Sequence, residues 1–188
     1  MMTPEVVLDF WLQELTEKDW YAGGCDLDAR ITTRFGEAVA AARDGQFIDW
    51  QANPRGALAY LILTDQMSRN IHRETPLAFG CDALAHAAAD RALFRNWDQR
   101  IDGAARQFFY LPFMHGETMA DQNRSVACFA TRFDDAENLL HARAHREVIR
   151  RHGRFPTRNA ALARHSSAAE LAYLAAGGYG ALVKELRG

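Results

Sequence analysis

Two residues near the middle of the chain, His115 and Glu117, are of the types that exchange protons in acid–base catalysis. They directly follow the aromatic run FFYLPFM, residues 108–114. Large apolar side chains this dense are usually buried, and each contributes about 1.5–3 kcal/mol when it leaves water. Polar groups at the edge of such a cluster must be paired. We therefore interpret His115 and Glu117 as a candidate catalytic pair beside a buried aromatic cluster.

Polar residues gather in three stretches, and each stretch adjoins an apolar helical pattern. A pocket beside an aromatic cluster needs a few convergent polar groups, so these stretches favour a ligand site. We expect Asp65, Arg69, His115, Glu117 and Arg158 to converge in space. The candidate ligand-binding residues are Asp65, Arg69, Asn70, His72, Arg73, Asp121, Gln122, Arg154, Arg158 and Asn159.

The same polar residues also fit structural clamps, because helix ends need partners for their unpaired amides and carbonyls. Asp65 and Arg69 can pair on one helical face, whereas Glu117 and Asp121 at the same spacing would repel. If Glu117 serves a ligand site, Glu117→Gln should be neutral or stabilising because that repulsion ends, and the spacing favours this outcome. If Glu117 is a clamp partner, the same change should cost about 3–5 kcal/mol.

Histidine and cysteine patterns give little support for a metal or cofactor. His141 and His145 lie one helical turn apart and could chelate a metal, but a site needs a third ligand. Glu117 or His115 could supply it only if the fold brings them close. Cys25, Cys81 and Cys128 are widely spaced, with no CxxC. No P-loop or GxGxxG is present. We expect no metal and no cofactor.

The overall composition is that of a globular protein of 188 residues, with a formal net charge of −2. This charge argues against binding to nucleic acid or to an anionic membrane. The scattered cysteines and the lack of a signal peptide or long apolar run predict a cytoplasmic protein. Lys18 and Lys184 are the only lysines, so arginine supplies nearly all positive charge. Arginine suits bidentate contacts with anions.

Helical periodicity and capping signals divide the chain into helices joined by short loops. Thr3-Pro4 and Asn53-Pro54 are N-cap and first-turn signals, and Ser167 with Glu170 forms a capping box. The predicted helices cover residues 4–15, 26–43, 54 to about 65, 82–95, 103 to about 114, 119–133, 135–152 and 168–176. Asp26 and Asp102 are the expected caps of two of them, residues 16–25 form a loop, Gly153 ends the seventh helix, and Gly177-Gly178 ends the last.

No segment alternates apolar and polar residues in the manner of a strand. The predicted fold class is therefore all-α, with residues 1–188 forming a single compact domain of about eight antiparallel helices. The run at 108–114 belongs to its central helix.

Three separated motifs resemble one bacterial family, the domain-of-unknown-function family 924. They are DQMSRNIHRETPLAFGCD, ARQFFYLPFMHGETMADQNRSVACF and HREVIRRHGRFPTRNAALARHSSAAELAYL, and the opening VLDFWLQEL also resembles the family's start. Met67-Ser68 departs from the family's more usual Phe followed by Pro or Ser. The resemblance implies an all-helical fold with tetratricopeptide-like superhelical packing, and it implies no established activity.

Three functions fit the sequence. The first is a binding module whose Arg-rich polar groove holds an acidic peptide or a small anionic ligand. The second is a small enzyme that uses His115 and Glu117 as acid–base partners on an anionic substrate. The third is a structural or dimerising protein whose polar clusters are clamps. Whether the protein is an enzyme, and whether it forms a homodimer, are left open.

Overall fold

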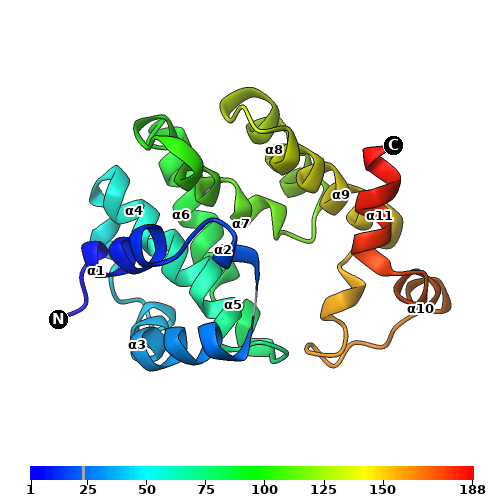
Figure 1. Ribbon diagram of the computed structural model, residues 1–188, viewed down its shortest axis with the longest axis horizontal. Helices are drawn as coiled ribbons and strands as arrows, with labels where there is room; N and C mark the ends of the chain where they lie inside the picture. The colour runs from blue at the N-terminus through cyan, green and yellow to red at the C-terminus, as the bar shows by residue number, and fades with distance from the viewer. Residues whose placement is uncertain (23) are drawn as a thin grey trace. The chain divides into compact units, whose positions relative to one another are not determined.

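Helices are the regular elements in the computed structural model, which describes residues 1–22 and 24–188 (Figure 1). No strand occurs within these residues, so the predicted all-α class is confirmed. The described chain forms two compact units, Met1–Pro112 and Phe113–Gly188, and we describe each by itself. The single domain and the superhelical packing stay predictions.

The first unit alternates α-helices with short 3₁₀ and π-helical segments. Its α-helices are α1 (Pro4–Asp9), α2 (Asp19–Ala22), α3 (Cys25–Arg43), α4 (Pro54–Leu61), α5 (Ser68–Ile71) and α6 (Asp82–Phe94). Its π-helical segments are Phe10–Glu14 and Ile62–Met67, and its 3₁₀ segments are Ile48–Ala52, Pro76–Phe79, Asp98–Arg100 and Gly103–Phe109. The predicted loop over 16–25 is wrong in part, because Asp19–Ala22 forms α2, and Gly23 lies outside the described residues.

The helix starts in the first unit follow local capping chemistry. Thr3 Oγ1 accepts from the Val6 amide at 3.4 Å, and Asn53 Oδ1 accepts from the Gly56 amide at 2.9 Å, so both predicted caps are confirmed. The predicted cap at Asp26 is wrong. Gly24 occupies the N-cap position of α3, and Asp26 lies in the first turn, where its charge favours the positive end of the helix dipole.

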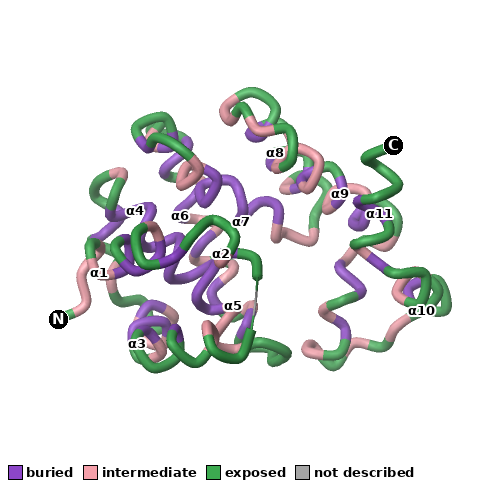
Figure 2. Tube along the Cα trace, in the orientation of Figure 1, coloured by how far each residue is buried: buried purple, intermediate pink, exposed green. Residues whose placement is uncertain are grey.

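The core of the first unit is aromatic and is drawn as buried in Figure 2. The Phe10 and Phe35 rings lie 4.9 Å apart, and Trp20 Nε1 donates to the Trp11 carbonyl at 2.7 Å. Every residue of α4 after Arg55 is buried. Gly56 is required there, because a Cβ at this position would lie 2.0 Å from the Trp50 carbonyl oxygen.

The aromatic run is buried as predicted, but it is not one central helix. A 3₁₀ segment, Gly103–Phe109, precedes the four-residue helix α7 (Leu111–Met114), and Asp102 makes no side-chain cap bond. Pro112 explains the break, because proline lacks an amide proton and is tolerated only in the first turn of a helix. The helix therefore restarts immediately before Pro112 and ends before His115.

The second unit packs helices α8 (Met119–Arg132), α9 (Ala136–His152), α10 (Ala168–Ala175) and α11 (Gly178–Arg187), with a 3₁₀ turn at Pro156–Arg158. Helix α9 contacts both α8 and α11. Its buried cluster contains Val148, Ile149, Phe155 and Leu182, with Tyr173 and Tyr179 packed against it. Gly153 ends α9 with a left-handed φ of 70°, as predicted.

Helix α11 was not predicted from the sequence. Gly177-Gly178 was interpreted as the end of the last helix, and it does end α10, with φ of 97° at Gly177. The same pair also starts α11, which continues over residues 178–187 despite Gly180. Leu182 and Val183 are buried, so tertiary packing outweighs the low helix propensity of the glycines.

The capping box at the start of α10 gives a first prediction. Ser167 Oγ accepts from the Glu170 amide at 3.2 Å, and a Glu170 carboxylate oxygen accepts from the Ser167 amide at 2.7 Å. We expect Ser167→Ala to lower the free energy of unfolding by about 1 kcal/mol because an N-terminal amide loses its acceptor. Urea denaturation measures this loss, and Ser167→Asp, which keeps an acceptor, should restore most of it. Equal loss in both variants would show that the cap is not the cause.

Candidate functional site

Glu117 lies between α7 and α8, in the second unit, and both of its carboxylate oxygens are occupied. Oε1 accepts from the Phe155 amide at 2.7 Å and from Arg164 Nη2 at 3.0 Å, and Oε2 accepts from Arg164 Nη1 at 2.7 Å. The Glu117 and Arg164 side chains are 25% and 22% exposed. This forked ion pair holds the chain after α9 against the segment before α8.

The charge of Glu117 is stabilised by these contacts. Desolvation raises the pKa of its carboxyl group, but the hydrogen bonds from Arg164 and the Phe155 amide outweigh it and lower the pKa overall. The carboxylate therefore contributes stability above its unfolded pKa, and this contribution is lost as the pH falls through the lowered folded value. The hydrogen bonds that hold the Glu117 carboxylate thus come from Phe155 and Arg164.

The predicted helical spacing of Glu117 and Asp121 is wrong. Thr118 is the N-cap of α8, so Glu117 lies outside the helix and Asp121 lies in its first turn. Asp121 Oδ2 accepts from the Thr118 hydroxyl at 2.7 Å, and the Asp121 amide donates to that hydroxyl at 3.1 Å. Asp121 thus takes part in the cap of α8.

Arg154 and Asn159 belong to the same set of clamps. The Arg154 guanidinium binds both carboxylate oxygens of Glu170, at 2.6 and 2.8 Å. The hydrogen bonds from Arg154 lower the pKa of Glu170, with the Ser167 amide adding to the effect. Asn159 is buried, and its Oδ1 accepts from Arg164 Nε at 2.9 Å. These contacts stabilise the irregular segment between α9 and α10.

Gln122, another candidate ligand-binding residue, is fully buried. Its Nε2 donates to the carbonyls of Met114 and Gly116, both at 2.7 Å. The side chain thereby satisfies carbonyls at the end of α7 that the helix itself leaves unpaired. Its contacts are those of a structural residue.

His115, His145 and Arg158 converge in the second unit from three separate segments. The Arg158 guanidinium lies over the Phe155 ring, 4.6 Å from its centroid, and Nη2 donates to the His115 carbonyl at 2.8 Å. The His145 ring lies 5.6 Å from Phe155 and 6.5 Å from His115, centroid to centroid. Two of the sequence-predicted residues, His115 and Arg158, are thus brought together with His145.

The first histidine of the HxxxH pair, His141, contacts the start of α11. His141 Nδ1 lies 2.6 Å from the Tyr179 hydroxyl, and Nε2 lies 3.3 Å from a Glu137 carboxylate oxygen. His145 Nδ1 lies 2.9 Å from the His141 carbonyl and donates to it. Each histidine thus uses Nδ1 within the protein. The described residues contain no group of three or more His, Cys, Asp or Glu arranged to hold a metal ion.

The first unit holds the remaining candidates, and Asp65, Arg69, Asn70 and Arg73 are paired. Within the described residues, the buried Nε2 of His72 has no hydrogen-bond partner. Arg69 Nη2 bridges Asp65 at 3.1 Å and Asp82 at 2.8 Å, so the predicted Asp65–Arg69 pair is confirmed. Asp65 is buried in the π-helical segment Ile62–Met67. Burial lowers the pKa of Arg69, but the two carboxylates outweigh burial and raise it. This cluster links the π-helical segment to the first turn of α6.

Asn70 and Arg73 both bind Asp28 on α3. Asn70 Nδ2 donates to it at 2.8 Å, and Arg73 donates through Nε at 2.7 Å and Nη2 at 3.0 Å. The hydrogen bonds from Arg73 lower the pKa of Asp28. His72 is half-buried, and burial lowers the pKa of its imidazole, with the Arg43 charge adding to the effect. These contacts join α5 to α3.

The five polar residues that were predicted to converge belong to two different units. His115, Glu117 and Arg158 belong to the second unit, and Asp65 and Arg69 belong to the first. The groove that would join them stays a prediction. The assignment of His115 and Glu117 as a catalytic pair also stays a prediction, although the contacts of Glu117 favour a clamp.

Several partners in these clamps were not on the list of candidate site residues. Arg164 and Glu170 lie 47 and 16 residues from the groups they bind, and Asp28 lies 45 residues from Arg73. A pair of residues this far apart along the chain produces no periodic pattern in the sequence. The i,i+4 rule found the Asp65–Arg69 pair because it is local.

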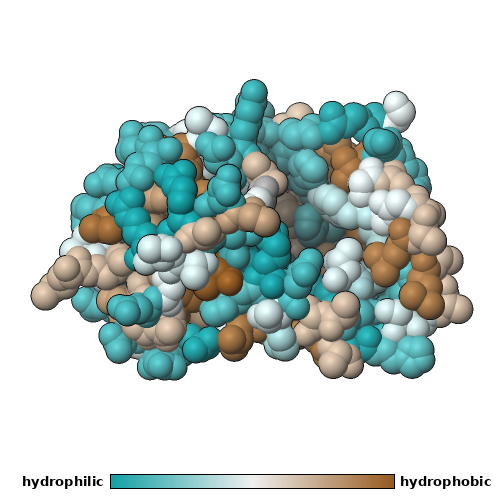
Figure 3. Space-filling view, turned by 60° about the horizontal axis from the view of Figure 1, so that its bottom comes forward, coloured by the Kyte–Doolittle hydropathy of each residue, from teal (hydrophilic) through white to brown (hydrophobic). Residues whose placement is uncertain are grey.

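Exposed hydrophobic residues are distributed over many elements. In the face shown in Figure 3, hydrophobic residues form separate patches among hydrophilic ones. In the described chain, the large exposed ones are Met1, Tyr21, Ile48, Leu77, Phe94, Met119, Leu171 and Leu186. A homodimer therefore stays a prediction. Within the same residues, the helices are too short or too polar to cross a membrane.

A comparison with known protein families assigns the chain to one family. Residues 7–178 match the family described as "Bacterial protein of unknown function (DUF924)". The chain belongs to this family, as its motifs suggested. No curated protein matches it.

A solved structure is similar to most of the chain. It is the structure of the protein of unknown function ATU0120 from Agrobacterium tumefaciens, with 34% sequence identity and a TM-score of 0.86. The match covers 91% of this chain and 96% of that one. The structural similarity supports the helical fold, and neither comparison assigns an activity.

Proposed function

We propose that this protein is a binding module for a small anionic ligand, held in the second unit by Arg158, His115 and His145. The proposal rests on two observations: Arg158 and His145 both contact the Phe155 ring, and His115 contacts His145 through its ring and Arg158 through its carbonyl. The Arg158 guanidinium is positioned by stacking on Phe155 and by its bond to the His115 carbonyl. A guanidinium fixed in this manner loses little entropy when it binds an anion through its fork of N–H groups.

Electrostatics supports the same assignment. The pKa of His145 is lowered to about 3, chiefly by desolvation and further by the positive charges of His115, His141 and Arg158. Only its bond to the His141 carbonyl acts in the opposite direction. Desolvation disfavours a charge of either sign, but the coulombic contributions of His115, His141 and Arg158 favour a negative one. An anion bound beside Arg158 should therefore raise the pKa of His145.

The finer expectations from the sequence belong to this proposal. We infer a tetratricopeptide-like packing of the helices, which the family resemblance implies. We also infer a cytoplasmic location, which fits the free thiols of Cys25, Cys81 and Cys128. An acidic peptide is the other ligand that the sequence suggests, and it is an outcome of the test below.

An enzyme that uses Glu117 as a general base is less well supported. A general base needs a lone pair directed at the substrate proton. Phe155 and Arg164 occupy the Glu117 oxygens, and these bonds favour the ionised form without offering it to a substrate. The contacts of Glu117 therefore favour the binding module over this enzyme.

Arg158→Ala tests the proposal. We expect inorganic phosphate to shift the imidazole NMR signals of His145 and His115 in the parent protein and to raise the pKa of His145. Arg158→Ala should weaken the apparent affinity by about 10- to 150-fold, because one charged hydrogen-bond donor is worth about 1.5–3 kcal/mol.

Arg150→Ala is the matched control. Arg150 is an exposed arginine of α9 that pairs with Glu147, so its loss should leave phosphate affinity unchanged. Hexaglutamate is titrated in parallel, and tighter binding of that peptide would assign the site to an acidic peptide. Imidazole signals that respond to neither probe, or equal losses in both arginine variants, would contradict the proposal.

A further inference from the structure

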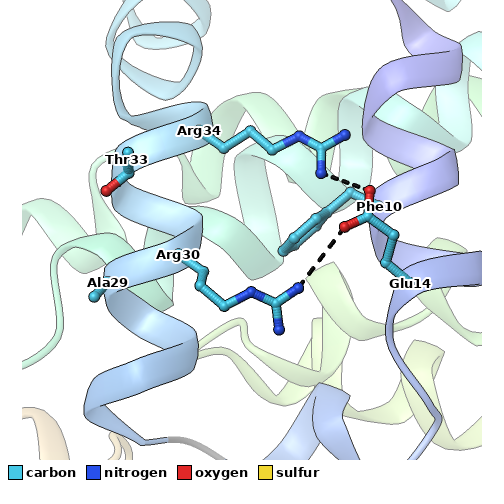
Figure 4. A pocket seen from close by; sticks show the side chains of 6 residues that line it. All are labelled: Phe10, Glu14, Ala29, Arg30, Thr33 and Arg34. Carbon is cyan, nitrogen blue, oxygen red and sulfur yellow. Dashed lines mark hydrogen bonds and ion pairs between the residues drawn. The ribbon is translucent and has the colours of Figure 1, made fainter.

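A separate depression lies on the surface of the first unit, between the π-helical segment Phe10–Glu14 and helix α3 (Figure 4). Its volume is about 390 Å³, within the range of small-molecule sites. The residues that line it are Phe10, Glu14, Ala29, Arg30, Thr33 and Arg34. None of them belongs to the polar stretches described above.

Two arginines of α3 stack on one aromatic ring in this pocket. The guanidinium carbons of Arg34 and Arg30 lie 5.0 and 5.5 Å from the centroid of Phe10. Both distances lie within the range of a cation–π contact. Arg30 and Arg34 are one helical turn apart, so their like charges repel. An anion between the two guanidinium groups would offset this repulsion.

Glu14 is the anion that the protein itself provides. Arg34 Nη1 donates to Glu14 Oε1 at 2.5 Å, whereas Arg30 Nη2 lies 3.7 Å from Oε2, beyond hydrogen-bond distance. The Arg30 side chain is 55% exposed, and those of Arg34 and Glu14 are both 41% exposed. An exposed pair of this kind is weak, and a ligand can replace it at low cost.

We propose that this pocket binds a small organic carboxylate, which replaces Glu14 between the two guanidinium groups. Glu14 shows that a carboxylate fits between them (Figure 4). Glu14 is the last residue of its π-helical segment and Leu15 is extended, so the side chain stands where the helix ends. Arg30 completes the ligand's hydrogen bonds, because it donates none to Glu14. The remaining volume beside the exposed Ala29 and Thr33 takes the apolar body of the ligand.

The experiment compares benzoate binding by the full chain and its variants in isothermal titration calorimetry. Glu14→Gln removes the internal competitor and should tighten benzoate binding up to about fivefold, because an exposed pair is worth at most about 1 kcal/mol, whereas Arg30→Ala should weaken it about tenfold. Glu17→Gln and Arg55→Ala are the controls, because each removes the same charge from an exposed position of the same unit. Both controls should bind benzoate as the parent does.

The outcomes separate this pocket from the phosphate site of the second unit. Arg158→Ala should leave benzoate binding unchanged, so failure at one site does not decide the other. Thermal denaturation is the folding control: each variant should melt at the same midpoint temperature as the parent. The proposal is overturned if Glu14→Gln binds benzoate no better than Glu17→Gln does, or if Arg30→Ala binds it as tightly as the parent. It is also overturned if inorganic phosphate displaces benzoate at equal concentration.

Discussion

Phe109→Ala is expected to lower the free energy of unfolding by about 3–5 kcal/mol. Phe109 is fully buried in the first unit, and the change removes a whole ring from a packed core. The loss combines the missing transfer free energy with the cost of the cavity that remains. It is a large share of a typical total stability of about 5–15 kcal/mol.

Urea denaturation followed by circular dichroism measures this loss. Phe94→Ala is the control, because Phe94 is 88% exposed and should change stability by less than about 0.5 kcal/mol. Equal midpoints for Phe109→Ala and the parent would show that the aromatic run is not part of the core.

Glu117→Gln is expected to lower the free energy of unfolding by about 2–3 kcal/mol. Glutamine keeps one oxygen acceptor but directs an NH₂ group at the Arg164 guanidinium, where two donors then face each other. The sequence favoured the opposite result, since a helical Glu117 would repel Asp121. The structure removes that reason because Glu117 lies outside α8.

The pH dependence gives this prediction a clear sign. The pKa of Glu117 is lowered in the folded state, so the parent gains stability above the unfolded pKa and loses it as the pH falls through the folded value. The difference between parent and Glu117→Gln should therefore shrink in acid. Glu185→Gln, which removes a charge from an exposed pair with Arg151, should cost less than about 1 kcal/mol at neutral pH.

Local signals were sufficient to predict most helix boundaries. Thr3, Asn53 and Ser167 each cap a helix through a bond to an amide three residues ahead, so the sequence alone contains the whole interaction. Gly153 ends α9 for an equally local reason, its left-handed φ. The single helix predicted over 103–114 is wrong because Pro112 breaks it, and because both 3₁₀ and α-helices place residues i and i+3 on one face, so a short apolar run does not distinguish them.

The polar clusters could be located from the sequence, but their partners could not. The sequence shows that residues near 65–73, 115–124 and 154–164 are polar beside apolar helices, and each stretch is indeed rich in buried or half-buried polar groups. It does not show that Arg164 reaches Glu117 or that Arg73 reaches Asp28, because those contacts depend on tertiary packing. A polar stretch therefore looks the same whether it binds a ligand or the protein itself.

The central claim is that Glu117 is a clamp partner of Arg164, and a double-mutant cycle tests it most directly. Glu117→Gln, Arg164→Gln and the double variant are compared with the parent by urea denaturation at neutral pH. We predict a coupling free energy of about 1.5–3 kcal/mol, because each single change already breaks the forked pair and the second adds little. Additive losses, or a Glu117→Gln variant as stable as the parent, would contradict the clamp and return Glu117 to the candidate site.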